Sequence, residues 1–478
     1  MTNAVSAAGP VAKSKPDLLT APILPMLLRL ALPNVAAMLV TALVAIAETV
    51  YMGLLGTTPL AAMALVFPMA MLTQMMSAGA MGGGVSSAIS RALGAGDATR
   101  AQMLALHAVV IGACAGLAFT AFFLMLGPAI FGLLGGSGRV LDQALIYSNM
   151  LFAGAIAIWL CNTLASIVRG TGNMQVPSLT LLLVAAIQIA LGGGLSLGLG
   201  PFPRTGIIGV AAGQIIAYVA GALFLLWFLL SGRARITLAP ERGSLRREMF
   251  LDILKVGAVA AFSPLQAVLT VLILTGLVAG FGTEALAGYG IGARLEFLLV
   301  PIVFALGVAC VPMVGMAIGA GDVARARSVA WMGGLVSVAT AGAIGLVVAV
   351  VPDLWSGLFT TDAGVRASAN LYLRWAGPCF GFFGLGLCLY FASQGAGRVV
   401  GPVLASTLRL MVIAAGGLLL SVTGAPAWGL FALVGLSMLA YGLGTAGAVY
   451  VTAWGATGRQ KPRQRGTSRR AARTRAAR

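Results

Sequence analysis

Two carboxylates, Glu48 and Glu296, stand deep inside long apolar segments and are the strongest sign of chemistry in this sequence. The chain has twelve acidic residues, and the other ten fall in polar segments or near the ends of apolar ones. A carboxylate at membrane depth is costly, so it marks a functional site. Such a group can bind a proton or a cation and release it again. Glu48 and Glu296 are therefore the candidate proton-coupling residues.

Glu48 follows Pro33 by fifteen residues in the first apolar segment. At a rise of about 1.5 Å per residue, the two lie about 22 Å apart along a helix. Proline lacks a backbone N–H and can kink a helix, so Pro33 is a candidate hinge below an ionisable side chain. A proton-driven bend of the helix would need this arrangement. A purely structural hydrogen-bonding role for Glu48 is the alternative.

Glu296 lies two residues after Arg294, a spacing at which helical side chains do not face each other. Each should therefore meet a partner elsewhere in the second half of the chain. Glu296 is either a second proton or cation site or one member of a structural ion pair, and the sequence leaves both readings open.

Two lone amides, Gln188 and Gln214, interrupt later apolar runs. Either they line a cavity near Glu48, or they join helices through hydrogen bonds. We assign Tyr51, Asn162 and Trp159 to the same substrate cavity.

Most enzyme chemistry is excluded by what the chain lacks. It holds one histidine, His107, which we expect to be a satisfied residue near the membrane surface. No His/Cys/Asp/Glu group has metal-ligand spacing, and no Ser/His/Asp set converges, so we expect neither an enzyme nor a metal site. The five cysteines have no CxxC spacing and are expected to be free buried thiols. No cofactor is implied.

Composition identifies a membrane protein with many helical spans. Of 478 residues, 59% are hydrophobic and only 9% are charged, against about 25% charged in soluble domains. The mean hydropathy is +1.00. Apolar runs of about 20 residues recur, which is the length that crosses a bilayer as a helix. Twelve such spans are predicted: 26–52, 60–89, 104–127, 145–168, 177–199, 206–230, 252–279, 285–317, 329–351, 372–394, 400–422 and 427–454.

The positive charges are distributed unequally between the two sides. With the N-terminus in the cytosol, 24 Lys/Arg fall in cytosolic segments and four in outer loops, while Arg294 and Arg409 lie within spans. Lys and Arg concentrate on the cytosolic side of membrane proteins, so both termini are expected inside. The net charge of +18 is therefore attributed to topology and anionic lipid headgroups rather than to nucleic acid.

The chain contains two copies of one unit. Three blocks recur at an offset of 225 or 226 residues: 93–101 (LGAGDATRA) as 318–326 (IGAGDVARA), 169–173 (RGTGN) as 394–398 (QGAGR), and 56–61 as 282–287. The glycine-rich GAGD turn predicts a helix end followed by a new N-cap. Six spans per copy place both copies in the same orientation, related by a pseudo-two-fold axis along the membrane normal, an arrangement found in transporters.

The repeat divides the chain into five parts. They are a cytosolic tail (1–25), a first six-helix lobe (26–230), a cytosolic linker (231–251), a second lobe (252–455) and a basic cytosolic tail (456–478). Glu48 aligns with Leu274, and Glu296 with Met71, so neither acid is duplicated. The two halves therefore share their frame and differ at the candidate coupling residues.

Several motifs together resemble the multidrug and toxic compound extrusion (MATE) family, in its bacterial DinF-like branch. They are Leu32-Pro33, the block 48–53 (ETVYMG) with Leu55-Gly56, and the repeated GAGD and RGTGN blocks. The resemblance implies an all-α fold of twelve transmembrane helices in two pseudo-symmetric six-helix bundles around a V-shaped cavity. It also implies export of small organic compounds, often cationic or amphipathic, in exchange for protons or sodium.

The chain departs from the family pattern around the expected ion site. Family members usually carry Asp where this chain has Glu48, and the Asn-x-x-x-Asp pair of many relatives reads Gln188 and Gly192 here. A threonine of the sixth helix is matched by Gln214. Sodium prefers several hard oxygens, so the loss of a carboxylate favours protons.

We therefore expect a monomeric proton-coupled multidrug exporter of the bacterial inner membrane. A sodium-coupled exporter and a flippase for lipids or lipid-linked oligosaccharides are the alternatives within the superfamily. A cavity faced by both Arg294 and Arg409 would favour the flippase. The methionines of the second span (Met63, Met69, Met71, Met75, Met76 and Met81) provide either a yielding ligand surface or ordinary packing.

Overall fold

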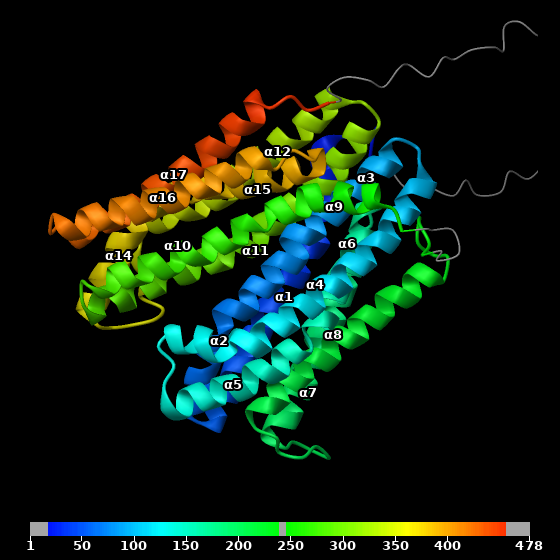
Figure 1. Ribbon diagram of the computed structural model, residues 1–478. Coiled ribbons are helices and arrows are strands. Elements are labelled where there is room, and N and C mark those ends of the chain that lie inside the picture. The colour runs from blue at the N-terminus through cyan, green and yellow to red at the C-terminus, as the bar shows by residue number, and fades with distance from the viewer. Residues whose placement is uncertain (1–17, 239–244, 456–478) are drawn as a thin grey trace, which may run out of the picture.

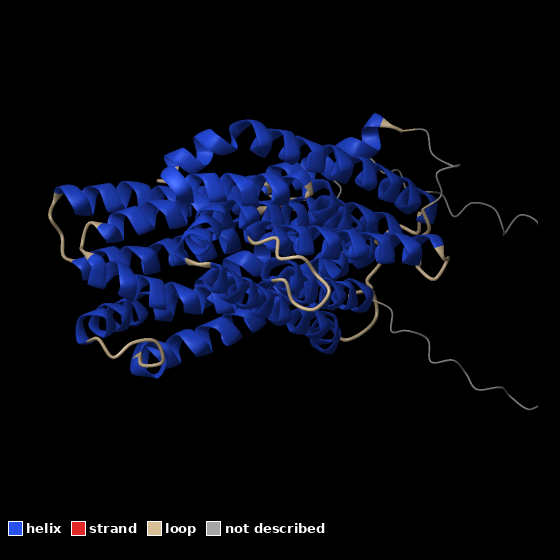
Figure 2. Ribbon diagram, turned by 90° about the horizontal axis from the view of Figure 1, so that it is seen from below, coloured by secondary structure: helices blue, strands red, loops and turns tan. Residues whose placement is uncertain are grey.

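A computed structural model describes residues 18–238 and 245–455, which form helices joined by short loops, with no strand in these ranges (Figure 2). The first half contains α1 (Ile23–Leu55), α2 (Thr57–Gln74), the π-helix η1 (Met75–Met81), α3 (Gly82–Gly94), α4 (Ala98–Leu133), α5 (Gly138–Ala153), α6 (Ala155–Gly170), α7 (Gln175–Leu197) and α8 (Ile207–Leu230). The second half contains α9 (Arg247–Ala260), α10 (Phe262–Ala279), α11 (Thr283–Gly319), α12 (Val323–Val350), α13 (Asp353–Ser356), α14 (Ala363–Ala376), the 3-10 turn η3 (Gly377–Cys379), α15 (Phe380–Ala396), α16 (Val400–Val422) and α17 (Ala427–Val451).

The predicted membrane spans are confirmed. Eleven of the described helical segments are long and apolar enough to cross a bilayer, and α5 with α6 forms a twelfth that bends by 44°. The first segment of the second half starts at Arg247, so helix begins within the predicted linker 231–251. The predicted tails lie mostly outside the described residues.

The helices form two bundles that share one end and diverge toward the other (Figure 1). The ends of α3, α6 and α12 gather at the shared end, where α1 begins and α17 ends. The far ends of α10 and α14 lie in one arm, and those of α5 and α7 in the other. We refer to the shared end as the closed end. The arrangement agrees with the V shape that the resemblance implies.

The hydrophobic core has three parts, and one of them joins the two halves. One cluster belongs to the first-half bundle and reaches into α9 through Met249 and Ile253. Another fills the far part of the second half. The third, at the closed end, combines Leu27 and Leu30 of α1 with the end of α11 and parts of α12 and α15. The first helix of each half therefore packs, at its start, against the core of the other half.

Two arginines at corresponding positions hold the starts of α1 and α9 against the opposite half. Arg325, at the start of α12, donates hydrogen bonds of 2.9 and 2.5 Å to the carbonyls of Leu18 and Ala21, just before α1. Arg100, its counterpart at the start of α4, forms a 2.8 Å ion pair with Asp252 of α9. The duplicated loops thus make equivalent cross-lobe contacts with different partners.

The GAGD turns fold as predicted. Asp97 caps α4 by accepting a 2.8 Å hydrogen bond from the backbone N–H of Arg100, and Asp322 caps α12 by a 2.9 Å bond from Arg325. The preceding Gly96 has a φ of 78°, the left-handed region that favours glycine. These turns end one helix and begin the next.

Glycines allow α3 and α11 to cross at very short range at the closed end. A Cβ on Gly94 would lie 2.1 Å from the carbonyl oxygen of Met316. A Cβ on Gly319, the counterpart of Gly94, would lie 2.1 Å from the carbonyl oxygen of Arg91. The two lobes therefore touch through a reciprocal pair of glycines.

Candidate functional site

Glu48 is held by one side-chain partner in the C-terminal half of α1. Its Oε1 accepts a 2.7 Å hydrogen bond from Nε2 of Gln188 on α7. Glu48 is 9% exposed and Gln188 is 7% exposed, so water has little access to the bond. The structure thus brings together two residues that the sequence placed near each other.

A second bond joins the same two helices beside the first. Tyr51 follows Glu48 by three residues and lies on the same face of α1. Its hydroxyl donates a 3.3 Å hydrogen bond to the carbonyl of Ile189. Its ring covers Gly193, where a Cβ would lie 2.9 Å from the ring. Glycine on α7 therefore allows the close approach that this contact needs.

Glu48 has no cationic partner within ion-pair distance in the described part of the chain, where ion pairs involve only Asp252 and Asp353. Gln214 on α8 is half-buried, and no hydrogen bond ties its side chain to Glu48. The Glu48 site therefore consists of one carboxylate and one amide, with a tyrosine beside them. Pro33 lies within α1, which continues through it as one helix.

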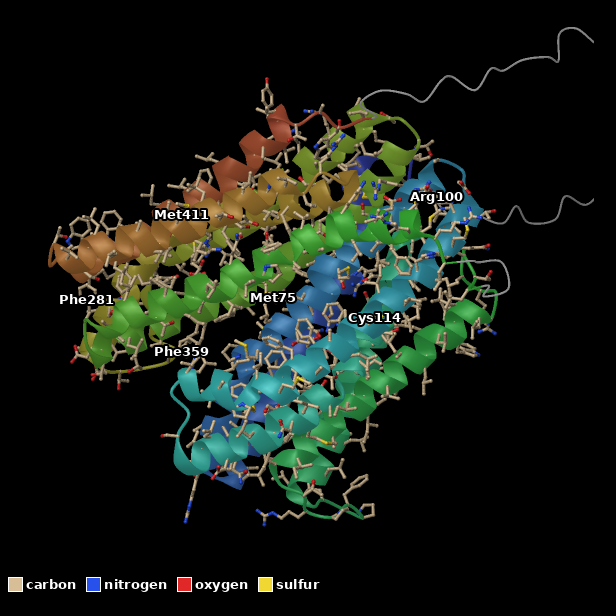
Figure 3. The ribbon with its side chains drawn as sticks, in the orientation of Figure 1. Met75, Arg100, Cys114, Phe281, Phe359 and Met411 are labelled. Atoms are coloured by element: carbon tan, nitrogen blue, oxygen red, sulfur yellow. The ribbon has the colours of Figure 1, made fainter. Side chains whose placement is uncertain are left out.

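Glu296 belongs to a separate site in the second half. The hydroxyl of Tyr372 on α14 donates a hydrogen bond to its Oε1. Arg294, by contrast, is exposed and stacks over the ring of Phe359 at 5.4 Å. Figure 3 shows Phe359 at the far end of the second-half arm. As expected, the two neighbours have different partners, both in the second half.

A cavity of about 390 Å³ lies between the lobes, mostly against the second half. Met71, Met75 and Phe67 line it from the first half, and Figure 3 shows Met75 where the two bundles approach each other. The second half contributes these polar side chains: Ser263, Gln266, Thr270, Tyr289, Glu296, Tyr390, Ser406, Arg409 and Tyr441.

None of the first-half polar candidates lines this cavity. Gln188, Gln214, Tyr51, Asn162 and Trp159 are absent from its wall, so their role in binding substrate stays a prediction. Of the acids in residues 18–238 and 245–455, only Glu296 faces the cavity.

Asn162 and Trp159 lie on α6. Asn162 donates hydrogen bonds to Ser77 Oγ at 2.8 Å and Gln74 Oε1 at 3.2 Å, at the start of the π-helix η1. Trp159 is buried against Phe119, with ring centroids 5.1 Å apart, and its Nε1 has no partner. Asn162 therefore joins helices at an irregular turn of the second span.

Sequence reasoning did not single out Gln266 or the tyrosines of the second half as site residues. For Arg409 the sequence shows a charge within a span and links it, together with Arg294, to the flippase alternative. Met71 and Met75 were noted with two readings, and they lie on the cavity wall. His107 is satisfied, as expected: it lies 2.7 Å from the carbonyl of Met103 and accepts a 2.8 Å bond from the Arg246 backbone N–H.

Comparison with known proteins identifies the family. The protein-family model described as MatE matches residues 33–192 and, a second time, residues 260–418. The chain belongs to the MatE family of membrane transporters. The double match also agrees with the internal repeat, because the same model fits both halves.

Relatives of this MatE protein align over most of its length. A protein named FAD transporter from Shewanella oneidensis is 26% identical over 84% of this chain and 88% of its own. The multidrug export protein MepA of Staphylococcus aureus (strain NCTC 8325 / PS 47) is 25% identical over 88% of this chain and 92% of its own.

A solved structure confirms the fold. It is described as the outward-facing conformation of a multidrug resistance MATE family transporter of the MOP superfamily. The match has a TM-score of 0.82 at 24% identity and covers 90% of this chain and 96% of that one. The all-helical two-bundle architecture expected from the sequence is therefore the MATE fold.

Proposed function

We propose that this protein is a secondary active antiporter that exports organic compounds in exchange for protons through Glu48. The observation that carries the proposal is the buried pair of Glu48 and Gln188, joined at 2.7 Å without a cationic partner. A carboxylate that no cation neutralises is suited to binding a proton. Protonation converts Glu48 from a pure acceptor into a group that also donates, and it weakens the acceptor in the bond from Gln188, so the hydrogen bonding between α1 and α7 changes with the proton.

The donor set favours a proton over sodium. The Glu48 carboxylate faces the Nε2 amide donor of Gln188, which cannot ligate a cation, whereas hard cations take several oxygen ligands. Within the described residues, no group of three or more His, Cys, Asp or Glu side chains gathers at one place. The departures of this chain from the family pattern, including Gly192 on α7, point the same way.

The lobes provide the conformational change. α1 has its start in the core of the second half and Glu48 in the first-half bundle, with Pro33 between them. A rearrangement at Glu48 would therefore change how α1 bends and how the lobes meet. Rocking of the lobes would then expose the cavity to each side in turn. Glu296 is the second candidate coupling residue because it faces the cavity.

The cavity wall suits amphipathic organic substrates. Methionine and aromatic side chains adapt to ligands of varied shape, while a few polar groups orient them. Relatives named for multidrug export and for FAD transport support small organic substrates. A lipid flippase is less well supported because Arg409 lines the cavity but Arg294 does not.

We place the closed end in the cytosol. It holds the GAGD turns and Arg91, Arg100 and Arg325, which agrees with the excess of cytosolic positive charge. The structure is then outward-facing, and the chain is a monomer of the bacterial inner membrane with cytosolic tails 1–25 and 456–478 and a linker at 231–251. Assignment to the DinF-like branch rests on the motifs around Pro33 and Glu48.

The experiment that tests this function is export of a fluorescent dye by purified protein in liposomes, with an imposed proton or sodium gradient. We expect the proton gradient alone to drive export by the native chain. The export rate should fall at least about 10-fold in Glu48→Gln, whereas Glu48→Asp should retain part of the native rate. Glu284→Gln is the matched control, because Glu284 is exposed at the start of α11. Export that needs sodium, or that survives in Glu48→Gln, would contradict the proposal.

A further inference from the structure

Arg409 on α16 is a cavity residue without an ion-pair partner within 4.0 Å in the described chain. It lines the space between the lobes, and none of the ion pairs in the described chain includes it. Its Nε is buried and has no hydrogen-bond partner. A charged side chain at membrane depth marks a functional site. An arginine that lacks a protein partner there therefore points to a ligand.

Aromatic rings hold the guanidinium in place. Its central carbon lies 4.9 Å from the ring centroid of Phe383 and 6.0 Å from that of Tyr441. Contacts with ring faces stabilise a cation but use none of its N–H donors. The planar edge of the guanidinium, which matches a carboxylate or phosphate, therefore stays available.

Glu296 is not an ion-pair partner of Arg409. It shares the cavity wall with Arg409, but the two are not within the 4.0 Å of an ion pair. Its Oε1 already accepts the hydrogen bond of Tyr372. The acid is thus turned to α14, while the base on α16 keeps free donors. Gln266 adds no donor for an anion, because its Nε2 binds Thr407 at 2.6 Å. Its buried Oε1 has no partner and can accept a hydrogen bond from another part of a ligand.

We propose that the cavity binds an organic anion with an aromatic body, whose carboxylate or phosphate is bound by Arg409. The proposal rests on the proposed transport function and names its substrate class. Met71, Met75 and Phe304 provide an apolar wall for the aromatic part, and the volume of about 390 Å³ admits a ring system. The cavity thus combines one fixed positive edge with an adaptable surface. This assignment replaces, for this cavity, the cationic substrates expected from the sequence.

Binding by a matched ligand series tests the assignment without requiring transport. The purified full-length chain in phosphatidylcholine nanodiscs is titrated calorimetrically with four naphthalenes carrying a carboxylate, a phosphate, a neutral hydroxyl or an ammonium group, and empty discs give the background. We expect the carboxylate, the phosphate or both to bind at least about 10-fold more tightly than the neutral and cationic compounds. The preferred anion identifies the acidic group.

Variants assign the preference to Arg409. Arg409→Gln should remove the preference for anions, and Arg409→Lys should retain part of it because the charge remains. Arg294→Gln is the matched control, because Arg294 lies outside the cavity. This variant should bind all four ligands as the native chain does. Glu296→Gln should tighten anion binding a few-fold by removing a negative charge, whereas a cation site centred on Glu296 would lose affinity. Thermal melting confirms that each variant folds, and Arg409→Lys tests the role of charge if Arg409→Gln does not fold.

A further arm separates soluble anions from lipid headgroups. If phosphatidylglycerol added to the discs displaces the naphthalene anion in the native chain but not in Arg409→Gln, a lipid phosphate is the natural source of the anionic group. If it has no effect, the source is a soluble anion. Tighter binding of the ammonium compound, or an anion preference that survives in Arg409→Gln, would overturn the proposal. Loss of dye export with the anion preference intact would contradict only the proposed function.

Discussion

The reciprocal glycine contact at the closed end predicts how to shift the lobes toward the second arrangement that the proposed rocking requires. In Gly94→Ala, the new methyl carbon would lie 2.1 Å from the carbonyl oxygen of Met316, and 2.7 Å from its Cα. An ordinary carbon–oxygen contact is more than 1 Å longer, so α3 and α11 would have to move apart. Both clashing atoms belong to the backbone of Met316, in the last turn of α11, so a side-chain rotation cannot relieve the overlap.

The cost of such overpacking is about 1–3 kcal/mol. The cost falls only on the arrangement in which α3 and α11 touch at this point. Separation of the closed end would relieve it, so the population of the opened arrangement should rise by about 5-fold to about 150-fold. Gly319→Ala should act in the same direction, because its methyl group would lie 2.1 Å from the carbonyl oxygen of Arg91 across the same crossing.

Distances between spin labels at positions 99 and 324 would measure this shift by pulsed electron resonance. Thr99 and Ala324 are exposed residues at corresponding positions near the starts of α4 and α12. The labels require a background without the five native cysteines. Gly94→Ala should add a longer-distance population that the background chain lacks.

Gly116→Ala is the matched control for the glycine variants. Its Cβ would lie 2.6 Å from Ile156 Cα, but both residues belong to the first half. This overlap should lower the melting temperature without changing the label distances. Unchanged distances in Gly94→Ala, or an equal shift in Gly116→Ala, would refute the proposed separation of the lobes at this crossing.

Two further predictions concern the loops. Asp97→Ala and Asp322→Ala each remove the N-cap of a helix at the closed end, so each should cost about 1 kcal/mol in thermal unfolding, and Asn at either site should restore most of it. The hydrogen bond from Asn370 and the adjacent Arg366 guanidinium hold the pKa of the Asp353 carboxyl below its usual range. A carboxyl with a lowered folded-state pKa adds stability that is present above its unfolded pKa of about 3.9 and lost as the pH falls through the folded value. The difference in melting temperature between the native chain and Asp353→Asn should therefore be constant near neutral pH and disappear in acid; a constant difference down to the lowest pH would contradict this.

The spans, the repeat and the GAGD caps could be predicted because each depends on local sequence. The proximity of Gln188 to Glu48 could be raised as one of two alternatives, because lone polar residues in apolar runs need partners. The Tyr372 partner of Glu296 could not be identified, since which helix faces an acid depends on the packing of distant spans. Arg409 shows the same limit: its position within a span was readable, but its rings and its missing counter-ion are properties of the assembled bundle.

The first helix of each half packs against the other half at the closed end. Through α1, a change at Glu48 can therefore influence the closed end. Arg325 fixes the chain before α1 to the second half, while Gln188 fixes the C-terminal part of α1 to the first half. α1 is therefore a strut between the lobes, and any change in its bend alters the angle between them. In the second half, Arg100 fixes the start of α9 to the first half, but that segment breaks at Ala261, within two residues of Val259, the counterpart of Pro33. The helix is already interrupted there, and Leu274 stands on α10 where Glu48 stands on α1, so α10 has no titratable group at that position. In the proposed mechanism the proton-dependent bend therefore belongs to α1, and the α9–α10 segment has no equivalent of Glu48.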